Sequence, residues 1–307
     1  SGSTLTLDEV GNRVSEHRLA QVPAMLPSIS RAYSYGNDDN MTSDSVWNYT
    51  NDNSGNRIAE TDGTGTATYN FLADNLLNSR MDTSGTDIAY TYDPLGHRIS
   101  KAIGADVIEY VLDLSSSLSH VLQITDSNGV VQSSYVYGHG LLERIDTADI
   151  ALFYHFDAQH NTVLLTDQDT VLKDFYTYDP FGAILSHSGT ATQPFTFLGE
   201  YGVELESPGV YYARARYYDA INGRFISKDA YDCDLNNPQT INRYVYSVNK
   251  PISIFDYTGL FGEQDNDSGF NNSYSYSEFN SATSTDLFWI KANNIFGNQN
   301  LSKIFTV

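Results

Sequence analysis

The sequence has little of several residue types, and each shortage excludes a class of protein. One cysteine, Cys233, in 307 residues excludes an internal disulfide and a cysteine-rich metal site. Basic residues are also scarce: 17 lysines and arginines stand against 38 aspartates and glutamates, a formal net charge of −21. Binding nucleic acid through its phosphates needs a cationic surface, so this balance argues against such a partner. No apolar run approaches the roughly 18 residues that cross a bilayer, so we expect no membrane span.

The chain also begins without a recognisable signal peptide. Residues 1–3, Ser-Gly-Ser, are interpreted as an expression scar, with the native start missing. What the chain has in quantity is tyrosine, with 23 copies against 3 methionines and 2 tryptophans. Tyrosine favours strands and brings a rigid ring whose hydroxyl can still find a partner when the ring is half buried. This composition favours a large curved sheet over a helical bundle.

A short motif recurs along the first two thirds of the chain. The motif is a glycine, a polar residue, an arginine and a β-branched residue, and it occurs at 11–14, 55–58 and 96–99. Weaker copies lie at 73–78, 126–130, 156–161 and 178–182. Self-similarity at a fixed spacing indicates a repeat architecture in which each unit packs on its neighbours.

Each repeat reads as a β-hairpin. A strand ending in Tyr-x-Tyr-Asp, as at 90–93, meets a turn with proline and glycine, and an alternating second strand follows. The aspartate can accept backbone N–H bonds in the turn, proline fixes φ, and glycine permits positive φ. Tyrosines two residues apart point to the same face, so stacked hairpins align them in ladders. The sequence therefore predicts an all-β array over residues 4–187.

These motifs resemble the YD repeats of Rhs and teneurin-type proteins. The resemblance implies a strand spiral that forms the wall of a hollow shell. Known shells use far more repeats than fit in this chain. We therefore expect a fragment of a shell, with an unusually small barrel as the alternative.

A more specific resemblance covers residues 176–260. Its motifs follow one another in a fixed order: Tyr-Thr-Tyr-Asp-Pro-Phe-Gly at 176–182, Gly-Val-Tyr-Tyr-Ala-Arg-Ala-Arg-Tyr-Tyr-Asp at 209–219, Gly-Arg-Phe-Ile-Ser-Lys-Asp at 223–229, Asn-Arg-Tyr-Val-Tyr at 242–246 and Asp-Tyr-Thr-Gly-Leu at 256–260. This order is similar to the Rhs-associated core domain that plugs the end of the shell. We predict that this domain occupies residues 188–260 and that residues 261–307 form an Asn/Ser-rich tail, which is either the stub of a cargo or a peptide that packs inside the shell.

In toxin-delivering relatives the core domain acts as an internal aspartyl protease that cuts once, after the leucine of a terminal Asp-Pro-x-Gly-Leu. By resemblance, the catalytic pair is Asp229 and Asp256, and the cleaved bond joins Leu260 to Phe261. This chain lacks the proline that follows each aspartate in the family motif. Ala230 and Tyr257 stand there instead, so we expect slow or incomplete cleavage.

Further residues near this pair are weaker candidates for the same site. Asp232 and Asp234 are alternative acids, and Arg224 and Arg243 are candidates to hold the pair or orient the carbonyl. Catalysis by two carboxylates needs one ionised to take a proton from water and one protonated to polarise the carbonyl. Close like charges produce that difference by raising one pKa. The alternative is that Asp229 and Asp256 only cap turns, as the repeat aspartates do.

The function predicted from these features is a shell that encloses a C-terminal toxin segment and releases it by self-cleavage after Leu260. The predicted partners are the chain's own C-terminal segment and either the missing N-terminal part of the shell or a partner shell or secretion protein. We expect delivery outside a bacterial cell or at its surface, with no cofactor and no metal. A surface adhesin that binds glycans or a neighbouring cell without proteolysis is the alternative, and a toxin activity within residues 261–307 is a third.

Overall fold

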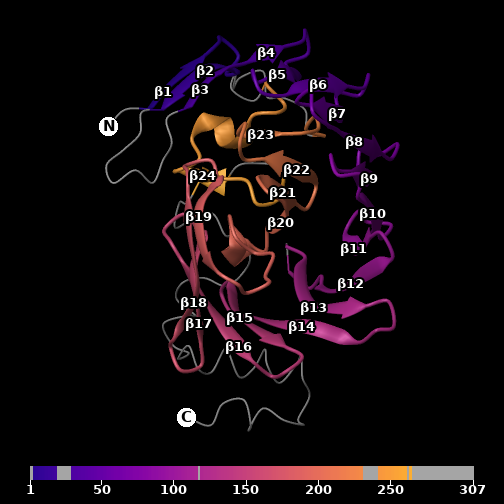
Figure 1. Cartoon of the computed structure of the whole chain (residues 1–307), viewed down its shortest axis with the longest axis vertical. Coiled ribbons are helices and arrows are strands. Elements are labelled where there is room, and N and C mark those ends of the chain that lie inside the picture. The colour runs from indigo at the N-terminus through magenta and orange to yellow at the C-terminus, as the bar shows by residue number, and fades with distance from the viewer. Residues whose placement is uncertain (1–2, 19–28, 117, 231–240, 261–262, 265–307) are drawn as a thin grey trace.

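The structure is a computed structural model, and it describes residues 3–18, 29–116, 118–230, 241–260 and 263–264. These residues contain strands and two short 3-10 turns, with no α-helix among them. The prediction of an all-β fold is confirmed. We call strands β1 to β19 the wall and residues 190–260 the plug, because the wall curves around the plug (Figure 1).

The first strands of the wall are β1 (Ser3–Leu7), β2 (Arg13–Arg18), β3 (Ile29–Ala32), β4 (Ser34–Tyr35), β5 (Met41–Ser43), β6 (Asn48–Asn51), β7 (Arg57–Thr61), β8 (Thr66–Phe71), β9 (Leu77–Met81) and β10 (Asp87–Tyr92). The remaining wall strands are β11 (Arg98–Ile103), β12 (Asp106–Asp113), β13 (His120–Asp126), β14 (Val131–Tyr137), β15 (Leu141–Asp146), β16 (Ala151–Phe156), β17 (Thr162–Asp167), β18 (Leu172–Tyr178) and β19 (Ile184–Gly189). The plug contains η1 (Gly199–Tyr201), β20 (Glu204–Ser207), β21 (Val210–Ala213), β22 (Arg216–Asp219), β23 (Arg224–Phe225), η3 (Tyr246–Asn249) and β24 (Ile254–Phe255), and β24 pairs with β25 (Glu263–Gln264).

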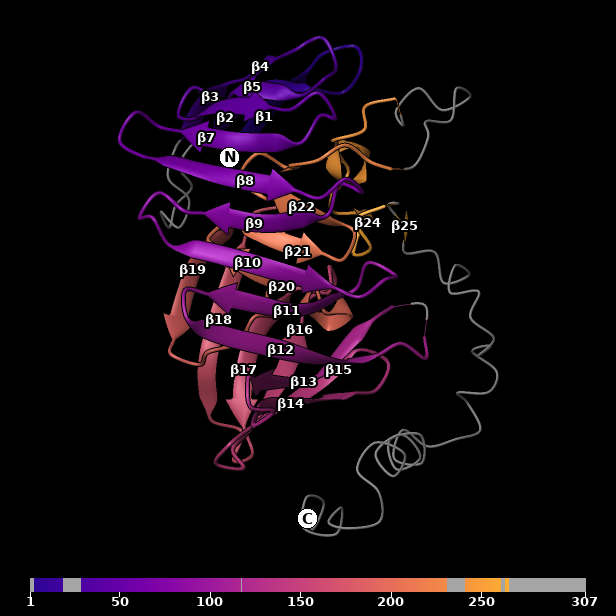
Figure 2. The same ribbon diagram turned by 90° about the vertical axis from the view of Figure 1, so that its right-hand side faces the viewer.

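The wall is an antiparallel meander in which neighbours in sequence are neighbours in space. Strands β4 to β19 form one sixteen-stranded sheet in chain order, and β1, β2 and β3 form a separate three-stranded sheet. Figure 2 shows the strands stacked one above another along the long axis of the molecule. Among the described strands β19 pairs only with β18, so this sheet is not a closed barrel. The predicted domain boundary at residue 187 falls inside β19, which ends at Gly189.

The repeat motif forms the same local structure each time it occurs. In the turn between β6 and β7, one carboxylate oxygen of Asp52 accepts the N–H groups of Ser54 at 2.9 Å and Asn56 at 2.8 Å. Gly55 adopts a φ of +88°, which glycine tolerates better than any other residue. The register of the hairpin then shifts by one residue, and this bulge recurs in the hairpins β10–β11 and β18–β19. The recurrence explains why aspartate, glycine and a following polar residue repeat in the sequence.

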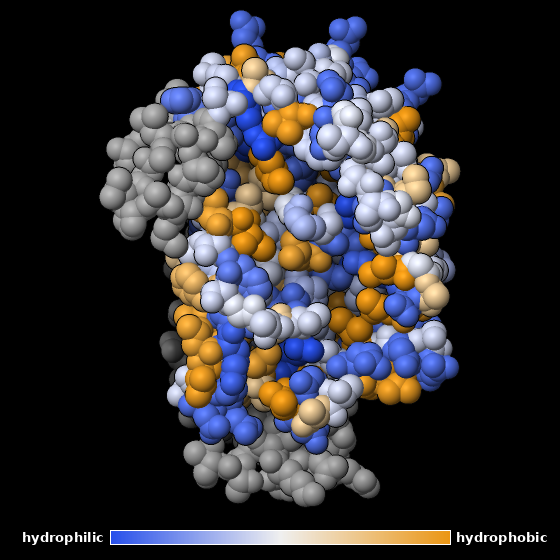
Figure 3. Space-filling view, viewed as in Figure 1, coloured by the Kyte–Doolittle hydropathy of each residue, from blue (hydrophilic) through white to orange (hydrophobic). Residues whose placement is uncertain are grey.

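Because the wall is a meander, its turns alternate between the two ends of the strands. The repeat turns, at 8–12, 52–56, 93–97, 157–161 and 179–183, lie at one end, which we call the plug-side rim. The turns at 62–65, 82–86, 126–130, 146–150 and 167–171 lie at the other end, which we call the far rim. The turn at 126–130, which the sequence counted as a weaker copy of the motif, therefore does not belong to the same series as the other copies. Figure 3 views the molecule from the direction of Figure 1, and hydrophilic and hydrophobic residues alternate over that face.

Tyrosines on the inner face of the wall fill the space between wall and plug. Tyr90, Tyr110 and Tyr135 are at most 8% exposed. Two of these hydroxyls find partners on the plug: Tyr90 donates to Glu206 at 2.7 Å and Tyr110 donates to Glu204 at 2.9 Å. A buried tyrosine is stabilised when its ring packs against apolar groups and its hydroxyl is hydrogen bonded. The predicted tyrosine ladders thus face the plug.

The repeat arginines also point inward and pair with acids of the plug. Arg57 lies 2.9 Å from Asp219, and Arg98 lies 2.9 Å from Glu206. The same Glu206 accepts Lys101 at 2.8 Å. Burial alone would raise the pKa of Glu206, but Arg98 and Lys101 overcome that effect and lower it. Removing one partner of such a buried pair is strongly destabilising, so these contacts fix the position of the plug inside the wall.

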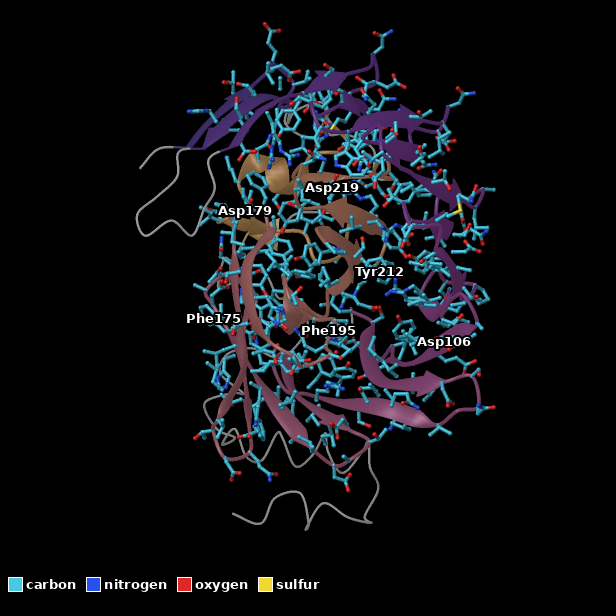
Figure 4. All side chains as sticks on the ribbon, viewed as in Figure 1. Asp106, Phe175, Asp179, Phe195, Tyr212 and Asp219 are labelled. Atoms are coloured by element: carbon cyan, nitrogen blue, oxygen red, sulfur yellow. The ribbon has the colours of Figure 1, made fainter. Side chains whose placement is uncertain are left out.

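The plug is packed around aromatic rings that several segments contribute. Phe197, Tyr218 and Tyr246 lie in one buried cluster, with ring centroids 5.8 Å apart for Phe197 and Tyr218 and 4.4 Å apart for Tyr218 and Tyr246. Figure 4 shows the labelled plug residues Phe195, Tyr212 and Asp219 within the curve of the wall. This dense packing holds the loops that follow β23 and β24, where the predicted catalytic residues lie.

Candidate functional site

Asp256 caps the turn that carries the predicted cleavage site. It follows β24, is 3% exposed, and one of its carboxylate oxygens accepts the N–H groups of Gly259 at 2.8 Å and Leu260 at 3.2 Å. The hydroxyl of Thr258 lies 3.2 Å from the same oxygen. We call residues 256–260 the cleavage turn. The capping role that the sequence left open as an alternative is therefore present, and it positions the backbone of Leu260.

Gly259 allows this turn to lie against the hairpin of β21 and β22. Its φ is +72°, and a Cβ added to it would lie 2.4 Å from the carbonyl oxygen of Ala213. Real Cβ atoms do not approach a backbone oxygen that closely, so a larger residue would push the turn away from the hairpin. The glycine of the terminal motif is needed here for both its conformation and its small size.

Arg216, the first residue of β22, joins the two predicted catalytic aspartates. One of its terminal nitrogens lies 2.7 Å from Asp229 Oδ2 and 3.4 Å from Asp256 Oδ2. Its Nε donates to the carbonyl oxygen of Gly259, and its other terminal nitrogen donates to that of Arg243 at 3.0 Å. A single guanidinium thus brings together two carboxylates and the backbone next to Leu260.

The surroundings of Arg216 are unusual for a charged group. Its side chain is 5% exposed and its guanidinium lies 3.6 Å from the centre of the Phe225 ring. Burial lowers the pKa of Arg216, and the charges of Asp256 and Asp229 oppose that effect. A buried guanidinium with fixed partners has little freedom to move, which holds both carboxylates in place.

The two arginines that the sequence suggested for this site occupy different places. Arg243 contacts Asp229 through the main chain: its guanidinium and its carbonyl oxygen bond the carbonyl and the N–H group of Asp229. Arg224 contacts neither aspartate. Its guanidinium donates to Asn12 at 2.8 Å and to the carbonyl oxygen of Asp39 at 2.7 Å, and burial lowers its pKa to about 10. Arg224 therefore connects the plug to the first repeat.

Sequence reasoning missed the arginine that reaches both acids. The signal was present in the Arg-Ala-Arg motif at 214–216, which places two arginines around a short hairpin turn in an otherwise aromatic run. Asp232, Asp234 and Phe261 lie outside the described residues. Among the residues that the structure describes, no group of three or more histidine, cysteine, aspartate or glutamate side chains could hold a metal ion. Within the same residues no helix is long and apolar enough to cross a membrane.

A sequence profile of the Teneurin YD-shell family matches residues 21–252. The "tRNA3(Ser)-specific nuclease WapA" of Bacillus spizizenii is 30% identical over 213 residues, which cover 68% of this chain and 9% of that protein. The "Toxin protein Tse5" of Pseudomonas aeruginosa is 32% identical over 108 residues, or 35% of this chain and 8% of Tse5. The chain therefore spans about a tenth of the length of these relatives.

Solved structures share the fold at lower sequence identity. The crystal structure of TcdB2-TccC3 matches with a TM-score of 0.62 and 16% identity, covering 84% of this chain and 14% of that one. The crystal structure of TcdB2-TccC3-Cdc42 gives a TM-score of 0.62 over 84% of this chain and 13% of that one. The sequence profile, the WapA similarity and the shared fold agree with the repeat motifs and the curved wall. The chain belongs to the Teneurin YD-shell family of Rhs and YD-repeat proteins.

Proposed function

We propose that this chain is the plugged part of a toxin-carrying shell and that it cuts its own backbone once, after Leu260. The observation that carries the proposal is the position of Arg216, whose guanidinium contacts Asp229, Asp256 and the carbonyl oxygen of Gly259. Two carboxylates close to one peptide bond are the minimum for aspartyl proteolysis. The relative Tse5, which is named as a toxin protein, supports the carrier role.

The reaction adds one water molecule across the Leu260–Phe261 peptide bond. One carboxylate accepts a proton from the water, whose oxygen then attacks the carbonyl carbon of Leu260, while the other, protonated carboxyl donates to the carbonyl oxygen. The carboxyl that took the proton from water then passes it to the nitrogen of Phe261, and one hydroxyl of the tetrahedral intermediate returns a proton to the other carboxylate. The C–N bond breaks as the C=O bond reforms, and the nitrogen of Phe261 leaves as an amine. We assign no separate acid and base roles, because a close pair of carboxylates titrates as a unit.

The site differs from the intact family motif where each proline is missing. In place of the second proline stands Tyr257, which is 5% exposed and packs on Tyr201 with ring centroids 4.4 Å apart. This packing gives the cleavage turn a different means of support from a fixed proline φ. A misplacement of about 1 Å can cost a hundredfold in rate, so we expect cleavage that is slow or incomplete.

The wider role follows from the proposed cleavage. Residues 261–307 would be the cargo or the stub of a longer one, and the rest of the enclosing wall would come from a preceding part of a longer protein or from a partner shell or secretion protein. We propose that the assembly is delivered outside the producing bacterium or displayed at its surface. The similarity to Tse5, which is named as a toxin protein, supports this setting.

Self-cleavage can be tested by intact mass spectrometry of the purified chain beside two variants, Asp229→Asn and Asp256→Asn. We expect a fragment beginning at Phe261 from the wild type and none from either variant. Asp219→Asn is the matched control, because Asp219 is also a buried plug aspartate that pairs with an arginine, Arg57, outside the site. Cleavage that persists in Asp229→Asn and Asp256→Asn, or that stops equally in Asp219→Asn, would contradict the assigned pair.

A further inference from the structure

Arg214 occupies a position in the plug that disfavours its own residue type. It is the first of the two residues that connect β21 to β22, and its φ is +58°. Two-residue hairpin connections need positive φ, and glycine, asparagine and aspartate supply it most readily. A long side chain kept at such a position costs of order 1–3 kcal/mol unless its surroundings compensate. The contacts of its guanidinium must therefore offset this cost.

The guanidinium of Arg214 binds carbonyl oxygens from three separate segments. It donates from Nε and Nη2 to Ser119 O at 3.3 and 3.0 Å, from Nη2 to Tyr201 O at 2.5 Å, and from Nη1 to Tyr257 O at 2.7 Å. No aspartate or glutamate in the described part of the chain forms an ion pair with it, and burial lowers the pKa of Arg214. Among the described residues, its charge is thus compensated by the dipoles of these backbone carbonyls, and all three segments contribute to them.

One of these segments belongs to the wall. Ser119 lies in the connection between β12 and β13, and the preceding Leu118 is 6% exposed within the aromatic core of the plug, in the same cluster as Tyr201 and Tyr257. The hydroxyl of Ser116 donates to the carbonyl oxygen of Leu118 at 2.7 Å, which shapes this connection for entry into the plug. The wall therefore reaches into the plug beside Arg214.

Another of the segments is the cleavage turn. Arg214 binds the carbonyl oxygen of Tyr257, and the N–H group of Ala215 donates to that of Thr258 at 3.1 Å. Both carbonyls lie between Asp256 and Gly259, where the carboxylate of Asp256 caps the turn. The β21–β22 connection thus holds the backbone of the cleavage turn from one side and the wall from the other.

We propose that Arg214 is a positioning residue that makes the geometry of the cleavage turn depend on docking of the wall segment 118–119. This inference rests on the proposed self-cleavage. When the segment is absent, Arg214 loses two of its four hydrogen bonds and no longer offsets the strain of its own backbone. The turn that carries Leu260 is then held less firmly against Asp256 and Arg216. Cleavage would therefore follow docking of this wall segment on the plug.

Hydrogen exchange tests the coupling without any need for cleavage. The amides of Gly259 and Leu260, both bonded to Asp256, report directly on the turn. We expect about tenfold faster exchange of these amides in Arg214→Gln and in Leu118→Ala, because hydrogen bonds from a charged donor are lost or weakened. Arg214→Gly suits the positive φ and serves if the glutamine variant folds poorly. Unchanged exchange of the two amides in the folded Arg214 variants would overturn the proposal.

Arg57→Gln is the matched control for a general loss of stability. It also breaks a buried contact between wall and plug, to Asp219, but it does not touch the cleavage turn. We expect it to lower the thermal midpoint while the exchange of Gly259 and Leu260 relative to other plug amides stays as in the wild type. An equal acceleration in Arg57→Gln would show that any weakening of the wall contact loosens the turn, and would overturn a specific role for Arg214.

The rate of self-cleavage gives the second measurement. We expect the first-order rate to fall about tenfold or more in Arg214→Gln, to recover in part in Arg214→Lys, and to keep its pH profile in both, because Arg214 moves no proton. A wild-type chain that is never cut would refute the proposed function, while the exchange measurement still decides the inference. A wild type that is cut and an Arg214→Gln variant cut at the same rate would refute the inference alone.

Discussion

The two rims of the wall are built from similar turns but have different surroundings. On the plug-side rim, Asn56 and Asn161 are 1% exposed and lie beside the plug. Gly55 lies in the same turn as Asn56, and a Cβ added to it would lie 2.3 Å from the hydroxyl of Tyr244 in the plug. On the far rim, no atom of the described residues lies within 4 Å of a Cβ added to Gly85 or Gly129. The turn motif alone therefore does not predict whether its residues pack against the plug or only reverse the direction of the chain.

The difference has a physical origin in the arginine that follows the repeat turn. On the plug-side rim, Arg57 and Arg98 point inward and their charges are compensated by acids of the plug. On the far rim, the aspartates cap their own turns, as Asp126 does by accepting the N–H groups of Asn128 and Val130. Aspartates cap the turns at both rims, and on the plug-side rim the arginine that follows the turn adds a long-range ion pair to the plug.

The largest loss of unfolding free energy should come from replacing aromatic residues that are packed between the wall and the plug. Replacing Tyr217 or Phe225, which are 3% and 2% exposed, by alanine should cost roughly 3–5 kcal/mol, because each leaves a cavity in a packed core. Phe175, 37% exposed on the wall, is the control and should lose much less as Phe175→Ala. Denaturant unfolding measures all three. A Tyr217 or Phe225 variant within a few tenths of a kcal/mol of the parent would disprove that these rings stabilise the packing between the wall and the plug.

A smaller effect separates the glycines of the two rims. Gly55→Ala should cost about 3 kcal/mol, from strained φ together with the clash against Tyr244. Gly129→Ala has a similar φ of +76° but open space around it, so it should cost about 1 kcal/mol. The free energy of unfolding of the two variants gives the comparison. Equal losses of unfolding free energy would mean that backbone conformation alone determines the cost of the substitution at both rims.

The acids of the two regions should differ in how they make stability depend on pH. Arg98 and Lys101 hold the pKa of Glu206 below its usual value of 4.5 in spite of burial. A folded pKa below the unfolded one means that this contribution is present above about pH 4.5 and is lost as the pH falls through the folded pKa. We expect the stability of Glu206→Gln to depend less steeply on pH in that window than that of the wild type.

The control for this comparison is an exposed acid of the far rim. A hydrogen bond from Ser84 lowers the pKa of Asp82, but the side chain is open to solvent, so Asp82→Asn should change the pH dependence less than Glu206→Gln. Urea unfolding from neutral to acidic pH measures both variants. If Asp82→Asn changed the pH dependence of the unfolding free energy more than Glu206→Gln, the pH-sensitive contact would lie at the far rim and not between the wall and the plug.

The smallest effect belongs to a surface ion pair next to the far rim. Lys173 lies 2.7 Å from Asp167, and its side chain is 42% exposed. Exposed pairs of this kind contribute about 0–1 kcal/mol, so Lys173→Ala should barely change the unfolding free energy. Arg57→Ala, which leaves Asp219 buried without its arginine, should cost several times more. An equal loss of unfolding free energy in Lys173→Ala and Arg57→Ala would contradict this difference between the exposed and the buried pair.

The wall was predictable from the sequence because its information is local. Aspartate, glycine and proline set each turn within five residues, and the alternating tyrosines set the face that packs inward. Asp229 and Asp256 were predicted from the order of motifs along the plug, and their catalytic role stays a prediction. The structure adds that both meet one guanidinium.

The identity of that guanidinium was not predictable, because it depends on contacts between distant segments. Arg224 was a reasonable candidate from its place before Asp229, yet it reaches Asn12, 212 residues away. Arg216 meets Asp256 across 40 residues because the β21–β22 hairpin folds against the cleavage turn. Sequence spacing says which residues neighbour one another on a strand, while the partner across a core depends on how the segments pack.

The most direct test of the account is the mass of the wild-type chain after incubation across acidic and neutral pH. The arrangement of Arg216, Asp229 and Asp256 at the cleavage turn predicts slow conversion of the 34.1 kDa chain into two products, the smaller one beginning at Phe261. A chain that stays at 34.1 kDa under all these conditions, or that is cut at another bond, would show that the plug only closes the wall.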